Sequence, residues 1–253
     1  MKKSSKYLNH SLSLIISVGI MLFVMMVFAL SLGFLYVRSR QLVKQEAMER
    51  AERALNNTVL RVVSCLDEVE VATANTAWML DDYLQKDSLL NYTHRMVQLN
   101  PHINGCSITM EPGFFGEGTR NFSAYSLRGQ DTVMTVVEGD YNYYEKVWYK
   151  TPAEKQKDCW VDPFNDFNKG TLSSISMIVS YCQPLYNTRN EFIGVIATDL
   201  SVELFKEIVS AYTPYEHSYN FMLDSDGTYV VHPDRMKLVK MDIASVFEEK
   251  GQP

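Results

Sequence analysis

The sequence predicts an α+β protein that is anchored in a membrane by one helix. Three observations predict it: a long apolar run near the N-terminus, a stretch of helical periodicity without Pro or Gly, and a later region of short β-prone runs separated by turn residues. The 253 residues carry a net charge of −6 without a block of Lys or Arg. The chain is therefore long enough to bury a core, and nucleic acid is not an expected partner.

Residues 11–37 are almost wholly apolar and follow a short N-terminal segment, residues 1–10. The run exceeds the ~20 residues that cross a bilayer and the ~7–15 apolar residues of a signal peptide, and no small-residue cleavage site follows it. We therefore expect an uncleaved transmembrane helix. Basic residues flank both ends equally, so the orientation, with residues 1–10 in the cytoplasm, rests on the function of the later region.

Residues 38–86 predict a long stalk helix. Apolar or small residues recur every three or four positions from Ala47 to Leu80, which defines one helical face. We interpret this face as core or as the seam of a homodimer. A second, shorter helix is expected from Ser88 to Leu99, with Asp87 or Ser88 as its N-cap.

From residue 102 the pattern becomes strand-like. Short β-prone runs cover residues 103–110, 121–128 and 132–139, and the glycines between them are interpreted as turn residues rather than a phosphate cradle. The clearest strand pair covers residues 171–186 and 191–201. A connecting helix follows near residue 202, then a hairpin around Asp226-Gly227 and a last helix, after which we expect the chain to continue.

The region from residue 141 to residue 199 combines many aromatic rings with carboxylates and one well-placed cation. Ring faces attract organic ammonium ions, and carboxylates accept charge-assisted hydrogen bonds from them. A lysine opposite those acids can hold the carboxylate of a zwitterion. The composition of this region therefore favours a pocket for a small amine or amino acid.

The four cysteines form no CxxC pair and have no His at a metal-ligand spacing, so neither a metal nor another cofactor is expected. Cys106 and Cys182 each fall in an apparent strand. They pair if the compartment is oxidising, or remain buried thiols; spacing does not decide between these.

The order of these elements, with a Trp-Tyr pair at 148–149, the run GVIATDLS and the run FMLDSDGTYVVHPD, resembles the extracytoplasmic double Cache sensor domains of bacterial receptors. The resemblance implies a location in a bacterial inner membrane and two stacked PAS-like antiparallel-sheet modules. The membrane-distal, ligand-binding module would cover residues 87–203, and residues 204–253 would begin a truncated second module. A second membrane helix and an output domain, such as a histidine kinase or a PP2C-like phosphatase, would lie beyond Pro253.

One amino-acid-binding subgroup of that family carries a recurring motif that matches this chain in part. The implied ligand-binding residues are Tyr141, Lys146, Trp148, Tyr149, Phe164, Asp166 and Asp199. Lys146 stands where the motif has Arg, and Phe164 where it has Tyr. Lys offers a point charge instead of a two-pronged grip, so recognition of a ligand carboxylate is expected to be weaker than in that subgroup.

Two other functions fit the same residues. Asp162 and Asp166 could act as the acid–base pair of a membrane-anchored hydrolase, although residues around Pro163 in a loop give no reason to expect the required separation. Alternatively, the region is a scaffold that responds to a periplasmic partner protein. No residue of the chain is assigned a catalytic role.

Overall fold

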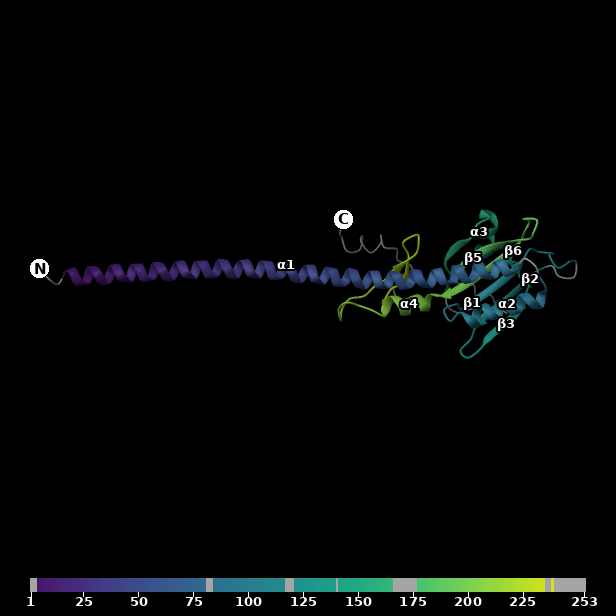
Figure 1. Cartoon of the computed structure of the whole chain (residues 1–253), viewed down its shortest axis with the longest axis horizontal. Coiled ribbons are helices and arrows are strands. Elements are labelled where there is room, and N and C mark those ends of the chain that lie inside the picture. Colours follow the sequence, from purple (N-terminus) through teal and green to yellow (C-terminus); the bar gives the residue numbers. More distant parts are fainter. Residues whose placement is uncertain are drawn as a thin grey trace. The chain divides into compact units, whose positions relative to one another are not determined.

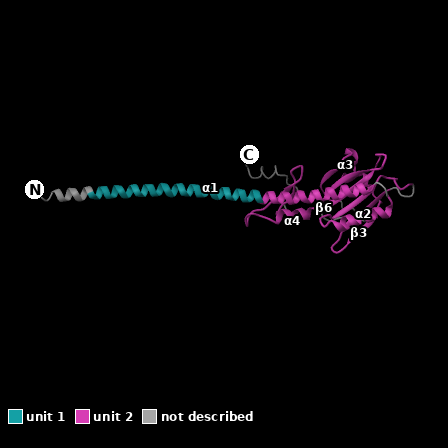
Figure 2. Ribbon diagram, viewed as in Figure 1, with its two compact units in different colours: residues 1–53 teal, residues 54–253 magenta. Residues whose placement is uncertain are grey.

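The computed structural model describes residues 4–80, 84–116, 121–139, 141–165, 177–234 and 238. The chain divides into two compact units, residues 1–53 and residues 54–253 (Figure 2). Helix α1, Ser4–Met79, contributes residues to both units. The predicted end of the stalk helix at residue 86 is therefore too late, and residues 81–83 lie outside the described part.

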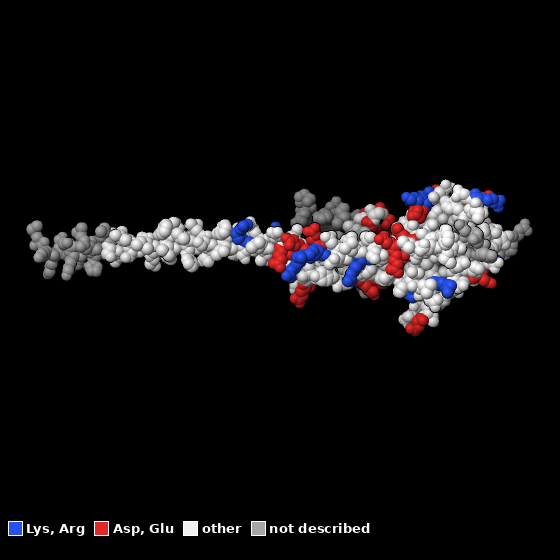
Figure 3. Space-filling view, viewed as in Figure 1, with Lys and Arg blue, Asp and Glu red and all other residues white. Residues whose placement is uncertain are grey.

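The first unit consists of the N-terminal part of α1 alone. From residue 13 to residue 37 its described side chains are exposed and uncharged, as the white section of the helix in Figure 3 shows. Within the described residues, α1 is the one helix that is long and apolar enough to cross a membrane. A helical segment of this length with exposed apolar side chains is stable in a lipid environment rather than in water.

The second unit is built on a six-stranded antiparallel sheet (Figure 1). Its strand order is β3-β2-β1-β6-β5-β4. The strands are β1 (Gly105–Met110), β2 (Phe122–Arg128), β3 (Val133–Glu138), β4 (Cys159–Phe164), β5 (Ile178–Tyr186) and β6 (Phe192–Ser201). The long-range β1–β6 pairing joins two three-stranded segments, β1-β2-β3 and β4-β5-β6, into one sheet and places Gly105 opposite Asp199.

Alternation along the strands divides the sheet into two different faces. On one face, Ile108, Ala124 and Ile196 belong to a core that includes Val69 of α1 and Leu89 of α2 (Lys86–Leu99). The other face carries a second, smaller cluster around Trp148, from helix α3 (Val147–Lys155) and the preceding 3-10 turn η1 (Tyr143–Glu145). The sheet is thus covered on both faces, which is why both sets of alternating residues are buried.

After β6 the chain forms helix α4 (Val202–Ser210) and the small hairpin of β7 (Met222–Leu223) and β8 (Tyr229–Val231). Ser201 caps α4, since its Oγ accepts a hydrogen bond from the Leu204 amide at 3.3 Å. Gly227 has a φ of 84°, as the predicted hairpin turn requires. A second complete sheet module is not shown: between α4 and residue 234, β7 and β8 are the described strands, and most of the last predicted helix lies outside the described part.

Two local expectations differ from the structure. Helix α2 begins at Lys86 after Gln85, which makes no side-chain cap, so neither Asp87 nor Ser88 is the N-cap. Asp162 and Phe164 lie in strand β4 rather than in a loop. Pro163 is tolerated there because β4 is the edge strand, where one side of the backbone has no ladder to complete.

The predicted stripe of α1 packs as core only in its later part. Val69, Thr73 and Leu80 are buried, whereas Leu55 and Val59 are about half exposed (50% and 49%). Thr73 also lies within hydrogen-bonding distance of β6, with its Oγ1 2.8 Å from the Oγ1 of Thr198. The later half of the stripe is therefore fixed to the sheet, and the earlier half leaves apolar side chains exposed.

Candidate functional site

The face of the sheet beneath η1 and α3 carries a buried row of small polar side chains. Ser107, Thr109, Ser123, Ser180 and Asp199 are all less than 7% exposed. They occupy the alternate positions that a strand pattern would assign to solvent. Buried polar groups must be hydrogen-bonded to be tolerated, so this row indicates a specific polar site rather than ordinary core.

Asp199 lies at the centre of this row. Its Oδ1 accepts a hydrogen bond from the Ser180 hydroxyl at 2.6 Å, and its Oδ2 accepts one from the Tyr125 hydroxyl at 3.3 Å. The Cα of Asp199 faces Gly105 across the β1–β6 ladder, where an added Cβ would stand 2.7 Å from Oδ2. The carboxylate therefore occupies the space that a side chain at position 105 would fill.

A small cavity lies against the Asp199 carboxylate, with a volume of about 20 Å³. This is room for roughly one water molecule. The lining residues are Ser107, Ser123, Tyr125, Glu138, Tyr141, Trp148, Phe164, Ala197 and Asp199. Four of the seven residues implied by the resemblance, Tyr141, Trp148, Phe164 and Asp199, thus meet at one cavity.

Trp148, which lines this cavity, carries an unpartnered hydrogen-bond donor. Its Nε1 is buried and has no hydrogen-bond partner among the described residues. Leaving such a donor unsatisfied costs about 1–3 kcal/mol, so a ligand atom or an ordered water is required to complete the site. The other two indoles differ: Trp160 Nε1 donates to Glu70 Oε1 at 2.7 Å, and Trp78 is 77% exposed.

Lys146 lies in a neighbouring, more open cavity of about 500 Å³ that shares Trp148 and Phe164 as walls. Its Nζ is 6.0 Å from the centroid of the Tyr141 ring. The lysine is therefore placed on the outer side of the two shared aromatic residues, and the Asp199 carboxylate on the inner side.

The remaining implied residues are not brought into the small cavity. Tyr149 is buried behind it, and its hydroxyl donates to Glu111 Oε2 at 3.1 Å. Burial, and then the negative charge of Glu111, raise the pKa of the Tyr149 phenol. Asp166 lies outside the described residues.

The carboxylate of Asp162 is exposed and accepts a hydrogen bond from the Ser225 hydroxyl of the β7–β8 hairpin at 2.7 Å. It therefore connects strand β4 to the hairpin. Asp199 is not the cap of α4, because Ser201 has that role. Among the described residues, no group of three His, Cys, Asp or Glu side chains is placed to hold a metal ion.

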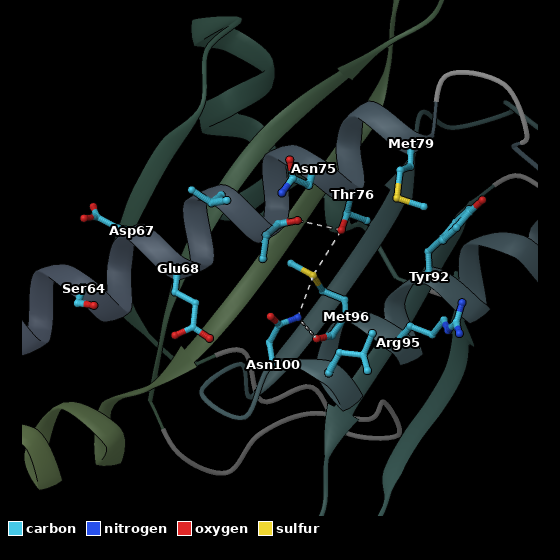
Figure 4. Close-up of a pocket in the computed structure, with 13 residues that line it drawn as sticks. Ser64, Asp67, Glu68, Asn75, Thr76, Met79, Tyr92, Arg95, Met96 and Asn100 are labelled. Atoms are coloured by element: carbon cyan, nitrogen blue, oxygen red, sulfur yellow. Dashed lines mark hydrogen bonds between the residues drawn. The ribbon is translucent and has the colours of Figure 1, made fainter.

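A larger groove of about 690 Å³ lies between α1 and α2 (Figure 4). Its residues include Asp67 and Glu68 on one helix and Arg95 on the other, with exposed apolar side chains at Val71 and Leu99. The unpartnered buried polar atoms identified in the described residues belong to Asn121, Trp148 and Gln183, which do not line this groove. The smaller cavity at Asp199 is therefore the stronger candidate for specific recognition of a small molecule.

The row of small polar residues was not recognised from the sequence. Its signal is present in GCSITM, where Gly, Ser and Thr alternate with Cys, Ile and Met. The sequence pattern predicts the alternation of polar and apolar side chains. The polar ones are buried only because helices cover both faces of the sheet, which the pattern does not indicate.

Residues 89–207 match the family model described as the first PDC sensor domain of methyl-accepting chemotaxis protein-like proteins. A curated relative, methyl-accepting chemotaxis protein PscA of Pseudomonas syringae pv. tomato, is 24% identical over 101 residues, or 40% of this chain. The aligned region spans about 15% of the length of that relative.

Solved structures share the fold. The structure of methyl-accepting chemotaxis protein X is similar with a TM-score of 0.64 and 16% identity, over 85% of this chain and 84% of that chain. The ligand-binding domain of the Pseudomonas aeruginosa amino acid chemoreceptor PctB in complex with L-Gln is similar with a TM-score of 0.56 and 16% identity, over 79% and 72%. Together, the family match and the six-stranded sheet make residues 89–207 similar to the Cache-type (PDC) extracellular sensor domains of chemoreceptors and histidine kinases.

Proposed function

We propose that this chain is the extracytoplasmic ligand-sensing region of a bacterial transmembrane receptor, and that it binds a small amino acid or amine at Asp199. The observation that carries the proposal is a cavity lined by Asp199 and by Trp148, a residue whose buried indole N–H has no hydrogen-bond partner among the described residues. The Cache-type module and the apolar N-terminal helix support the receptor class and its placement in the membrane.

The chemistry of the site assigns a role to each group. The Asp199 carboxylate accepts hydrogen bonds from the ligand ammonium, and the rings of Tyr141, Trp148 and Phe164 surround it with π faces. Lys146 lies beyond the shared rings, where it attracts the carboxylate of an amino acid. Tyr149, which is buried and bonded to Glu111, and Asp166, which lies outside the described residues, complete the proposed set of ligand-binding residues.

The small cavity requires its walls to move before a ligand enters. About 20 Å³ does not hold an amino acid, so the aromatic side chains must rearrange on binding. Such a rearrangement would act on β6, where Thr198, the residue before Asp199, lies against Thr73 of α1. This contact offers a direct route from the cavity to the helix that enters the membrane.

The domain organisation that we propose has residues 11–37 as the membrane span, 38–86 as the stalk segment, whose helix ends at Met79, 87–203 as the ligand-binding module and 204–253 as the start of a second module. Residues 1–10 would then lie in the cytoplasm, because the sensor module on the other side of the span is proposed to be extracytoplasmic. The structure of the PctB ligand-binding domain in complex with L-Gln supports an amino acid as one class of ligand for this fold.

The test is a thermal-shift screen of the chain in detergent against the common amino acids and simple amines. A ligand at about 100 times its Kd should stabilise the fold by about 2.7 kcal/mol, which raises the Tm by several degrees. Asp199→Asn should weaken binding by about 30-fold or more, since it removes the charge that pairs with the ammonium. Asp226→Asn is the matched control and should bind normally, because that exposed side chain lies in the β7–β8 turn and lines neither the small cavity nor the cavity of Lys146.

A second candidate is a sensor scaffold that responds to a periplasmic partner protein. The specific observation in its favour is the small volume of the cavity at Asp199, about 20 Å³, because the lining side chains leave little space for a ligand. A folded protein that shows no stabilisation with any compound of the panel would favour this function over ligand binding.

We also propose that the chain forms a homodimer through the earlier half of the stripe on α1. Within the second unit, Leu55, Val59 and Val63 are 50%, 49% and 44% exposed and follow one another at steps of four. Replacing Val59 and Val63 by Glu should shift the protein to monomer in analytical ultracentrifugation. Asn57→Glu is the control and should leave the dimer intact, because Asn57 lies about 140° around the helix from the midpoint of Val59 and Val63.

A further inference from the structure

Two of the four cysteines lie directly opposite each other in the sheet. Cys159 is the first residue of β4 and its Cα is paired with that of Cys182 in β5. Directly paired residues of an antiparallel ladder have Cα atoms about 4.5–5.5 Å apart and side chains on the same face. The Cα–Cα distance and the shared face are both compatible with a disulfide.

The other possible pairings are excluded by the same geometry. Cys106 is paired with Thr198 of β6, so β6 stands between Cys106 and Cys182. Two strand spacings are about 9.5 Å, beyond the reach of a disulfide. The two side chains also belong to different clusters on opposite faces of the sheet, and Cys65 lies on α1 within the cluster of Cys106.

Exposure differs between the facing thiols in a way that suits stepwise oxidation. Cys159 is partly exposed at the edge of the sheet, whereas Cys182 is buried. Burial raises the pKa of both thiols; Lys155 acts in the opposite direction on the pKa of Cys159, and the negative charge of Asp199 raises that of Cys182 further. Cys159 is therefore the thiol that an external reagent meets first.

We propose that Cys159 and Cys182 form a cross-strand disulfide when the module lies in an oxidising compartment. This inference rests on the extracytoplasmic placement in the proposed function. The oxidant is a dithiol–disulfide exchange protein in its disulfide form. The Cys159 thiolate attacks that disulfide and releases one partner thiolate; the Cys182 thiolate then attacks the Cys159 sulfur and releases the second. Two protons leave the chain's thiols, and the partner disulfide gains two electrons.

The link would fix the edge strand that carries part of the site. β4 contributes Phe164 to the cavity at Asp199, and its pairing with β5 shifts register between Val161 and Phe164. A covalent bond at residue 159 would hold the strand at the end where its ladder is regular. The disulfide is thus expected to stabilise the wall without entering the cavity.

The sequence makes the test unambiguous, because trypsin places each cysteine in its own peptide. Cys159 falls in residues 158–169 and Cys182 in 170–189, while Cys65 and Cys106 fall in 62–86 and 96–120. The full chain is expressed in bacterial membranes, free thiols are blocked with N-ethylmaleimide under acid quench, and the digest is analysed by mass spectrometry without reduction. We expect peptides 158–169 and 170–189 as one linked species and the other two as alkylated monomers.

Free, alkylated Cys159 and Cys182 in folded protein from an oxidising periplasm would overturn the proposal, as would a link to Cys106. A second arm oxidises the purified chain with oxidised glutathione, which tests the geometry even if the module is not extracytoplasmic. The same link should form there and raise the Tm by several degrees. Cys159→Ser is the matched variant: it should leave Cys182 reduced and abolish the rise. Binding of the ligand by the Cys159→Ser variant reports on the proposed function separately.

Discussion

Gly105 determines where the Asp199 carboxylate can lie. A Cβ at position 105 would stand 2.7 Å from Asp199 Oδ2 and 2.8 Å from the Tyr125 hydroxyl oxygen. These are side-chain atoms, so the fold can yield by moving the carboxylate rather than the backbone. The residue is thus required by the site more than by the sheet.

Gly105→Ala should therefore weaken ligand binding by about tenfold or more and lower the free energy of unfolding by about 1–3 kcal/mol, the usual cost of overpacking. Calorimetric titration and urea unfolding measure the two effects. Gly194→Ala offers the contrast, because its Cβ would stand 2.2 Å from the Thr109 carbonyl oxygen and should prevent folding. Unchanged binding by Gly105→Ala would contradict the position assigned to Asp199.

At the scale of elements, α1 is tied to the sheet by few polar contacts. Trp160 of β4 donates to Glu70 Oε1 at 2.7 Å, while Glu68, two residues earlier, faces His102 at the surface with a distance of 3.0 Å. Hydrogen bonds to charged groups contribute about 1.5–3 kcal/mol, and exposed ion pairs about 0–1 kcal/mol. The contact of Glu70 should therefore contribute more to stability than the contact of Glu68 on the same helix.

Glu70→Ala should lower the free energy of unfolding by about 1–2 kcal/mol, since the Trp160 indole loses a charged acceptor. Glu68→Ala, the matched control, should change it by less than about 0.5 kcal/mol. Urea denaturation followed by circular dichroism measures both. Equal effects of the two substitutions would show that the Trp160 contact does not fasten the helix.

The elements also show how far the sequence reaches. Periodicity predicts α4, the β7–β8 turn and the strands β1, β2, β3 and β6, because local patterns decide them. From the sequence, the residues around Pro163 are expected in a loop, whereas they lie in β4, an edge strand that tolerates a proline. The pairing of β1 with β6 is set by contacts distant in sequence, which local patterns do not contain.

The candidate site was predictable only in part, for the same reason. The resemblance brings forward Tyr141, Trp148, Phe164 and Asp199, which meet at one cavity. The resemblance does not predict that Lys146 lies in the neighbouring cavity, on the outer side of the shared aromatic walls. Nor does it predict that the Tyr149 hydroxyl is bonded to Glu111. These distinctions depend on which face each residue takes in η1 and α3.

At the scale of the whole molecule, buried thiols make stability depend on pH. Burial raises the pKa of all four cysteines above the ordinary value of 9.0. A raised pKa in the folded state means that the folded protein retains protons that the unfolded chain releases. Its stabilising contribution is complete below about pH 9 and falls as the pH rises beyond it.

The Tm of the reduced protein should therefore decline between pH 9 and pH 10.5, with each fully buried thiol adding up to about 1.4 kcal/mol per pH unit to the loss of stability. Scanning calorimetry over this range measures it. Cys106→Ala should make the decline shallower, because the most deeply buried thiols contribute most. A Tm that is constant over this range would contradict the burial of these groups.

The central claim, that a ligand completes the site at Trp148 and Asp199, is tested most directly by the indole N–H signals of the full chain labelled with ¹⁵N-tryptophan. The chain has three tryptophans in three different states: exposed at Trp78, bonded to Glu70 at Trp160 and unpartnered at Trp148. On titration with a ligand identified by the screen, the Trp148 signal should shift most, while the Trp78 and Trp160 signals serve as internal references. A bound ligand that leaves the Trp148 signal unmoved would contradict the account.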